Sequence, residues 1–324
     1  MNKVLTVVVP VFNEEACIDA LFTRLAKVRQ DMAGQVQVEY LFVDDGSRDH
    51  SLAMLSSLAA QHSFVKVIGF SRNFGHQIAV TAGIDFAQGD WVALIDADLQ
   101  DPPELLAPMF EQAQQGFDVV YGQRRSRKGE SAFKKFSAAA FYRVLSRLCD
   151  VDIPKDTGDF RIMSRRVVDV LKTMRERHRF IRGMVPWIGF KSTAFLYDRD
   201  QRFAGETKYP LMKMLKFAAN AIFSFSAKPL ALATQFGLFA VTLGVCGALY
   251  LLWAKLFANY PIPGVVTTVT AITFFGGVQT LLIGIQGEYV ARMFEESKGR
   301  PLYIVADKLN LPDQSTTQSA TDPC

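Results

Sequence analysis

The chain has 324 residues, more than one domain usually contains, which predicts a large domain with an appendage. Hydrophobic residues make up 49% of it and the mean hydropathy is +0.12, which favours a membrane-associated protein. The formal net charge of +4 is too small to indicate a nucleic-acid-binding protein, and four scattered cysteines without a C-x-x-C pair argue against a disulfide framework.

Strands and helices alternate along the first half of the chain. Apolar runs typical of strands buried on both faces occupy residues 4–9, 38–43, 65–70, 91–95 and 119–121. Helical stretches lie between them, at residues 14–31, 49–61, 75–87 and 103–115. The alternation predicts a doubly wound α/β domain with a mostly parallel sheet, which we place at residues 1–207.

Polar side chains follow four of these strands. They are Asn13 and Glu14, Asp44 and Asp45, residues 71–73, and Asp96 and Asp98. Because ligands of such sheets bind beyond the carboxyl ends of the strands, we expect these side chains to line one crevice.

Asp96 and Asp98 stand one residue apart in LIDADLQDPPE, directly after an apolar strand. Two like charges so close raise the pKa of one member unless a cation or solvent relieves them. One interpretation is a divalent metal site, since Mg²⁺ takes carboxylate oxygens together with substrate phosphates. The alternative is a solvated turn that caps the helix beginning at residues 102–104.

Two basic amphipathic helices are expected at residues 133–148 and 211–225. Such helices can lie in a membrane interface, and we assign residues 208–228 to an interfacial segment of this kind. The alternative is that both helices pack on the α/β domain.

A membrane hairpin is predicted at residues 229–290. Residues 229–254 carry no charge and residues 265–287 are again uncharged, so each stretch is long enough to span a bilayer. Basic residues cluster before and after this pair, which predicts two spans with both chain ends in the cytoplasm. Residues 291–324 then form a cytosolic segment with a disordered end, and small residues in the spans permit a homo-oligomer.

Six motifs occur in an order that resembles one enzyme family. They are VVVPVFNEE, VDDGSRD, FSRNFGHQIAVTAGIDFAQGD, DADLQDPPE, GDFR at 158–161 and RFAGETKYP at 202–210. The chain from Thr6 to about Arg300 resembles the polyprenyl-phosphate glycosyltransferases of the inverting A-type fold, a group that includes dolichol-phosphate mannose synthase and bactoprenol glucosyltransferases. The resemblance implies a Rossmann-like catalytic domain joined to interfacial helices and a two-helix transmembrane hairpin.

The resemblance also implies a nucleotide site. The residues concerned are Pro10, Phe12, Asn13 and Glu14 for the base and ribose, Asp44 or Asp45 for the base edge, and Arg72, Asn73, Arg202 and Lys208 for the phosphates. Alternatives remain for several of them. The first group can form a strand-to-helix turn with a capping Asn, Arg72 can form a structural salt bridge, and Asp49 is expected to cap the helix that follows it.

For the reacting groups, the resemblance implies that Asp96 and Asp98, with Gln100 as a further ligand, hold Mg²⁺ or Mn²⁺ and the nucleotide. Asp159 is placed beside the acceptor, either as catalytic base or as a residue that orients the acceptor. A lipid phosphate is already largely ionised at neutral pH, which weakens the need for a base.

An anionic acceptor needs cations. Candidates are Arg124, Arg125, Arg127 and Lys128, and then Arg202 and Lys208. The run at residues 124–128 can pair with the acceptor phosphate or contact anionic lipid head groups in general.

We therefore expect an enzyme of the bacterial inner membrane that moves one sugar, glucose from UDP-glucose by resemblance, to undecaprenyl phosphate with inversion, for O-antigen or cell-envelope glycan modification. GDP-mannose, UDP-N-acetylglucosamine and a UDP-aminoarabinose donor stay open. The rival from another class is a non-catalytic membrane partner that binds a nucleotide sugar. A flippase and a downstream transferase would act on the lipid-linked product.

Overall fold

The computed structural model describes residues 3–125, 154, 157–198, 228–257 and 264–311. Contacts divide the chain into two units. The first contains residues 1–139, 151–210 and 300–324, and the second contains residues 140–150 and 211–299. The expected amphipathic helices at 133–148 and 211–225 lie outside the described residues, as does the tail from residue 312.

The first unit is built on an eight-stranded mixed sheet in the order β7-β5-β6-β4-β1-β2-β3-β8. The strands are β1 (Val4–Val11), β2 (Gln37–Asp44), β3 (Val65–Phe70), β4 (Trp91–Leu94), β5 (Val119–Arg124), β6 (Thr157–Ser164), β7 (Ser192–Tyr197) and β8 (Val305–Leu309). The pairings among β4, β1, β2 and β3 are parallel, as is that of β5 with β7. The five strands predicted in the first half are confirmed, and so is the α/β class.

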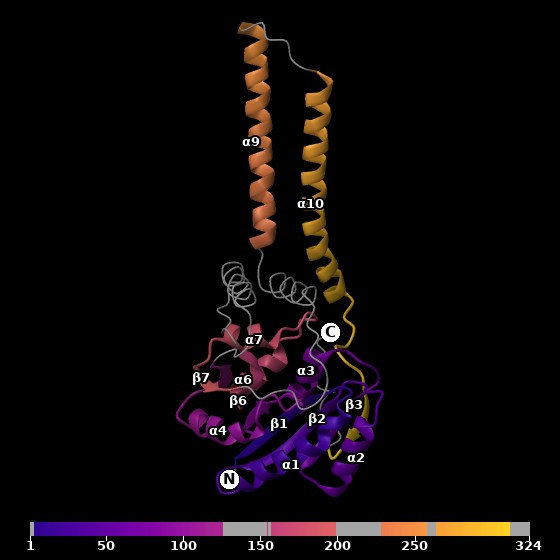
Figure 1. Ribbon diagram of the computed structural model, residues 1–324, viewed down its shortest axis with the longest axis vertical. Helices are drawn as coiled ribbons and strands as arrows, with labels where there is room; N and C mark the ends of the chain where they lie inside the picture. Colours follow the sequence, from indigo (N-terminus) through magenta and orange to yellow (C-terminus); the bar gives the residue numbers. More distant parts are fainter. Residues whose placement is uncertain (1–2, 126–153, 155–156, 199–227, 258–263, 312–324) are drawn as a thin grey trace, which may run out of the picture. The chain divides into compact units, whose positions relative to one another are not determined.

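Helices cover both faces of this sheet (Figure 1). They are α1 (Glu15–Asp31), α2 (Ser51–Gln61), α3 (His76–Phe86), α4 (Leu106–Gln114), α6 (Arg165–Thr173) and α7 (Ile181–Ile188), with the short 3₁₀ turn η1 (Pro103–Leu105) before α4. Contacts among α1, α2 and α4 group these helices on one face, and contacts among α3, α6 and α7 group those on the other. Because side chains alternate along a strand, those of β1 pack in the core on both faces of the sheet.

Sequence periodicity did not predict β6, β7 and β8. The β7 and β8 strands lie at the two edges of the sheet and are partly exposed, so they lack the continuous apolar run of a strand buried on both faces. The β6 strand pairs antiparallel with β4 and β5, which breaks the parallel pattern of the first half.

The chain after the second unit returns to the first. The β8 strand pairs antiparallel with β3, and Tyr303 stacks on Phe70 with ring centroids 5.2 Å apart while its hydroxyl donates to Asp85. The side-chain amide of Asn310 donates to three backbone carbonyls in residues 59–65. Residues 291–324, predicted as a cytosolic segment with a disordered end, thus include the end of α10 and the β8 strand.

The second unit contains α9 (Lys228–Phe257) and α10 (Val265–Ser297), which contact each other. Of the described residues, Lys228–Tyr250 meets the length and hydropathy expected of a membrane span, with mean hydropathy 1.7 and no buried residue in its most apolar stretch. The α10 helix continues ten residues past the predicted end at 287 and carries the ion pair of Arg292 with Glu288 at 3.1 Å. An exposed apolar helix is stable where lipid replaces water.

Gly83 lets α3 lie directly on β1. A Cβ atom placed at Gly83 would come within 2.1 Å of Cγ1 of Val8, whose side chain is fully buried. In an isolated helix, alanine is preferred over glycine by about 1 kcal/mol. The close approach reverses this preference, since overpacking a buried contact costs about 1 to 3 kcal/mol.

We predict that Gly83→Ala lowers the melting temperature of the purified protein by several degrees, because Val8 or the helix must move. Gly34→Ala is the matched control, since a Cβ atom at Gly34 meets nothing within 4 Å. A melting temperature of Gly83→Ala equal to or above that of the control would contradict this account of the α3 contact.

Candidate active site

Two acidic side chains meet where β4 ends and β6 begins. Leu94, the last residue of β4, pairs with Arg161 of antiparallel β6. Continuing this register by two residues sets Asp96 opposite Asp159, although the two are far apart in the sequence. Asp159 is buried and Asp96 is half-buried, so the domain holds two carboxylates together away from bulk water.

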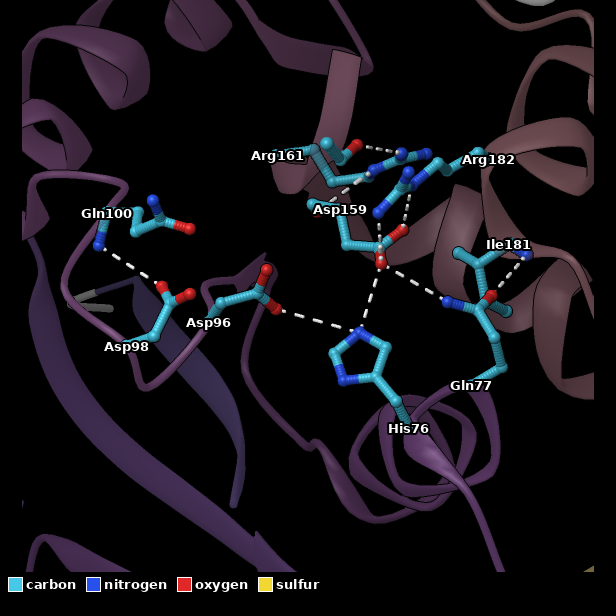
Figure 2. Close-up of polar contacts among 10 residues, drawn as sticks. His76, Gln77, Asp96, Asp98, Gln100, Asp159, Arg161, Ile181 and Arg182 are labelled. Atoms are coloured by element: carbon cyan, nitrogen blue, oxygen red, sulfur yellow. Dashed lines mark hydrogen bonds and ion pairs between the residues drawn. The ribbon is translucent and has the colours of Figure 1, made fainter. Parts of the chain in front are cut away.

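His76, the first residue of α3, lies between these carboxylates (Figure 2). Its Nε2 is 3.1 Å from Oδ2 of Asp159 and 3.6 Å from Oδ1 of Asp96. One ligand atom from each of the three residues can be chosen so that all lie within 4.8 Å of one another. His76 was not among the residues predicted for the site, because the sequence gives it no histidine or cysteine partner at metal-ligand spacing. Its position at the first turn after a strand end was the available signal.

Residues of α7 and α3 hold the carboxylate of Asp159 in one orientation. Arg182 donates from Nε to Oδ1 at 3.0 Å and from its terminal nitrogen to Oδ2 at 3.1 Å, a two-pronged ion pair. The Gln77 amide nitrogen also donates to Oδ2, at 3.2 Å, while its oxygen accepts from the backbone N–H of Ile181. Asp159 therefore links β6, α3 and α7 (Figure 2).

Burial and the neighbouring charges shift the pKa values of the three groups in this cluster. Burial raises the pKa of Asp96 to about 6, although His76 opposes the rise. Burial lowers the pKa of His76, but the hydrogen bond to Asp159 and the charges of both carboxylates outweigh it and raise the pKa to about 9. Burial also opposes ionisation of Asp159, yet Arg182 and His76 hold its pKa well below the usual range. At neutral pH His76 is positive and Asp159 has little affinity for a proton.

Asp98 and Gln100 lie farther along the same loop. Oδ1 of Asp98 accepts the backbone N–H of Gln100 at 3.1 Å, which makes a tight turn. Leu99 between them has φ +60°, a left-handed conformation that costs a residue other than glycine about 1 kcal/mol or more. The structure thus groups Asp96 with His76 and Asp159, and holds Asp98 and Gln100 together in the adjoining turn.

These residues fit a hard divalent cation. Oδ1 of Asp96 is buried and accepts no hydrogen bond, although Nε2 of His76 lies 3.6 Å from it. Carboxylate oxygens are the ligands that Mg²⁺ and Mn²⁺ prefer. Asp159 is less suited as a ligand, because Arg182 and Gln77 already bind its oxygens.

The two aspartates that end β2 have different surroundings. Both oxygens of buried Asp45 accept hydrogen bonds, from Asn73 Nδ2 and from the backbone N–H groups of Phe74 and Gly75. Asp45 therefore holds the turn that leads into α3. Asp44 is also buried, but while Oδ2 accepts from the Ser47 N–H, Oδ1 has no hydrogen-bond partner. Between the two, Asp44 is the one able to accept from a ligand.

The other predicted nucleotide residues surround this end of the sheet. Pro10 is buried in β1 beside Val43, whereas Phe12 is 42% exposed. Asn13 has φ +53° and bonds the turn after β2, donating to Ser47 Oγ and accepting from the Arg48 N–H.

Further contacts tie the same region together. The backbone N–H of Glu14 donates to Ser51 Oγ, and the Arg72 guanidinium lies 4.2 Å from the centre of the Phe74 ring. Asp49, predicted to cap the following helix, lies one residue before the N-cap His50, and its carboxylate accepts the N–H of Ser51, the first residue of α2. These contacts support the interpretation of this region as a strand-to-helix turn. Its role in binding a nucleotide stays a prediction.

Among the expected cations, Arg124 is the last residue of β5. Its guanidinium hydrogen-bonds the Tyr197 side chain, and its Nε is buried with no hydrogen-bond partner. Arg125 is exposed. The remaining predicted cations, Arg127, Lys128, Arg202 and Lys208, lie outside the described residues.

Comparison with known proteins agrees with this geometry. Residues 6–171 match Glycosyl transferase family 2, and residues 228–293 match the GtrB C-terminal hairpin. The uncharacterized glycosyltransferase YkcC of Bacillus subtilis is 49% identical over 300 residues, which cover 93% of this chain and 92% of that protein. The bactoprenol glucosyl transferase of Shigella phage SfV is 36% identical over 305 residues, covering 94% and 98%.

Among solved structures, glucosyl-3-phosphoglycerate synthase of Mycobacterium tuberculosis with Mn²⁺ and UDP shares 18% identity, with a TM-score of 0.43, over 68% of this chain and 78% of that one. The family match over the sheet that holds Asp96, together with relatives alike over nearly their whole length, shows that the chain is a glycosyltransferase and belongs to glycosyl transferase family 2.

Proposed function

We propose that this glycosyltransferase moves a single sugar from a nucleotide donor to undecaprenyl phosphate, and that the donor is UDP-glucose. The observation that carries the proposal is the likeness to a bactoprenol glucosyl transferase over 94% of this chain and 98% of that protein. The acidic cluster of His76, Asp96 and Asp159 supports it, because it lies beyond the carboxyl end of β4, where ligands of parallel sheets bind. The lipid-linked product would serve O-antigen or cell-envelope modification.

The transfer forms one bond and breaks one. An oxygen of the lipid phosphate attacks the anomeric carbon from the face opposite the diphosphate, and the nucleoside diphosphate leaves with the electron pair of the broken C–O bond. The anomeric centre is inverted. No proton has to be removed from the attacking oxygen, since a phosphate monoester has its second pKa near about 6 and is mostly ionised at neutral pH.

Each acidic residue then has a separate role. Asp96 and Asp98 hold a divalent ion, Mg²⁺ or Mn²⁺, with Gln100 as a further ligand. When bound, this ion supplies a Lewis acid for the charge that grows on the leaving diphosphate. Asp44 accepts an N–H of the base through its unpartnered oxygen. Arg124 is the described cation proposed for the acceptor phosphate.

Asp159 acts as an orienting residue rather than a base. The strongly lowered pKa, caused by Arg182 and His76, makes the carboxylate a poor proton acceptor. Its negative charge instead holds Arg182 and His76 in place and stabilises the positive charge that develops at the sugar carbon. The proposal thus takes the orienting role, one of the two that the sequence left open.

The hairpin is proposed to cross the bilayer twice, with both chain ends in the cytoplasm. The sheet supports this proposal, because β7 precedes α9 and α10 in sequence, β8 follows them, and both strands belong to one sheet. A chain that leaves and rejoins the same domain must cross a membrane an even number of times. If Lys228–Tyr250 spans, a second crossing is needed, and α10 is the helix proposed for it.

We predict that Asp98→Ala lowers transfer of labelled glucose from UDP-glucose to undecaprenyl phosphate by about 100-fold or more. Lewis-acid stabilisation supplies several kcal/mol, and each tenfold in rate corresponds to about 1.4 kcal/mol. Asp169→Ala is the control, because Asp169 is exposed on α6 and pairs with Arg165. Retention of most activity by Asp98→Ala would contradict the proposed ion-holding role of Asp98. No transfer by the unaltered protein would favour the non-catalytic rival, and transfer from a different labelled donor alone would overturn the choice of UDP-glucose.

A second prediction separates the roles of Asp159. Arg182→Ala should lower kcat/KM roughly 10- to 100-fold, since a hydrogen bond to a charged group contributes about 1.5 to 3 kcal/mol. A base would respond in the opposite way, because losing Arg182 raises its pKa and its proton affinity. The control is Arg166→Ala, which breaks a comparable ion pair with Asp118. An unchanged or faster rate for Arg182→Ala would contradict the orienting role.

The membrane topology can be measured with reporter fusions in a bacterial host. A green fluorescent protein joined after residue 324 should fluoresce, and alkaline phosphatase joined after residue 259 should be active, because two spans leave only the loop between them outside the cytoplasm. Inactive phosphatase at 259 together with active phosphatase at 324 would reject the double crossing.

A further inference from the structure

A buried hydrogen bond joins the loop after β4, residues 95–101 and called the acidic loop below, to the edge strand β7. Tyr197, the last residue of β7, donates its hydroxyl to Oδ1 of Asp101 at 2.5 Å. Asp101 is fully buried and Tyr197 is 4% exposed. Asp101 follows the proposed ion ligands Asp96, Asp98 and Gln100 in one short loop, yet neither it nor Tyr197 has a role in the reaction described above.

The loop needs such a contact. It leaves β4 after Leu94 and turns at Leu99, whose backbone is left-handed at φ +60°. A strained turn of this kind persists only when its surroundings determine it. Besides the Asp98–Gln100 hydrogen bond within the turn, the buried Leu99 side chain and the hydrogen bond from Tyr197 to the Asp101 carboxylate hold it in place.

Tyr197 is itself held in one position. Its ring packs edge-on against Phe160, the neighbour of Asp159, with centroids 5.8 Å apart. A Cβ atom at Gly122 would lie 2.9 Å from both rings, so glycine at this position lets them meet. The Arg124 guanidinium also hydrogen-bonds the Tyr197 side chain. One tyrosine therefore connects the acidic loop with β5 and β6.

We propose that Tyr197 and Asp101 are positioning residues that hold the loop of residues 96–100 in the shape that presents Asp96 and Asp98 to a divalent ion. This inference rests on the ion site of the proposed function. In this proposal neither residue is a ligand of the ion. Partners that orient metal ligands from behind commonly contribute 10- to 100-fold to metal affinity.

The chain provides a matched control for a purely structural role. Tyr303 is half-buried, stacks its ring on Phe70 and donates its hydroxyl to an aspartate, Asp85, at 2.8 Å. That pair joins α3 to the segment before β8 and includes no residue of the acidic loop. Removing either hydroxyl deletes one tyrosine–aspartate hydrogen bond, but only Tyr197 lies behind the proposed ligands.

The test titrates Mn²⁺ into the full-length protein in detergent with UDP present, by calorimetry, and measures the melting temperature of each variant alongside. Tyr197→Phe should raise the apparent dissociation constant for Mn²⁺ about tenfold or more. Asp101→Asn keeps an oxygen that can accept from Tyr197 and should show a smaller rise. Tyr303→Phe should lower the melting temperature while its Mn²⁺ affinity stays that of the unaltered protein.

Wild-type Mn²⁺ affinity in Tyr197→Phe would overturn the inference and leave the ion site intact. An equal loss of affinity in Tyr197→Phe and Tyr303→Phe would also overturn it, because the effect would then follow stability alone. If the unaltered protein binds no Mn²⁺, the proposed ion site is wrong, and the positioning role fails with it.

Discussion

The site depends on compensation of like charges at the ends of β4 and β6. The register of these strands brings Asp96 and Asp159 together away from bulk water, where two uncompensated carboxylates would repel strongly. The protein supplies His76 between them and Arg182 on the outer side of Asp159. Asp159 is neutralised by protein groups alone, whereas Asp96 keeps a buried oxygen without a hydrogen-bond partner. This asymmetry assigns the two acids different tasks.

The same logic separates the neighbouring pair at the end of β2. Asp45 uses both oxygens to fix the turn before α3, and that turn places His76 at the start of the helix. Asp44 beside it keeps one oxygen available. At each strand end, one acidic residue builds the local structure and its partner is left able to meet a ligand. A buried carboxylate oxygen without a partner costs free energy unless a cation or a hydrogen-bond donor meets it. The two acids of each pair therefore cannot exchange these roles without a loss of stability.

The sequence predicted the parallel core well, because strands buried on both faces carry continuous apolar runs and the helices between them have clear periodicity. It also predicted Asp96 and Asp98 as strand-end acids. It could not predict β8, whose exposed, charged residues VADKL become a strand only through pairing with β3. It missed His76 and Arg182, since their proximity to Asp159 arises from three elements distant in the chain. Local patterns carry no information about such tertiary contacts.

The central claim is that a divalent ion lets the carboxylates of Asp96 and Asp98 share a site with the donor diphosphate. Calorimetric titration of UDP-glucose into the purified protein, once with Mn²⁺ and once with excess EDTA, tests it most directly. The account predicts measurable binding with Mn²⁺ and a loss of roughly 100-fold or more in affinity with EDTA, since metal neutralisation of phosphate charge supplies several kcal/mol. Equal affinity under the two conditions would contradict it.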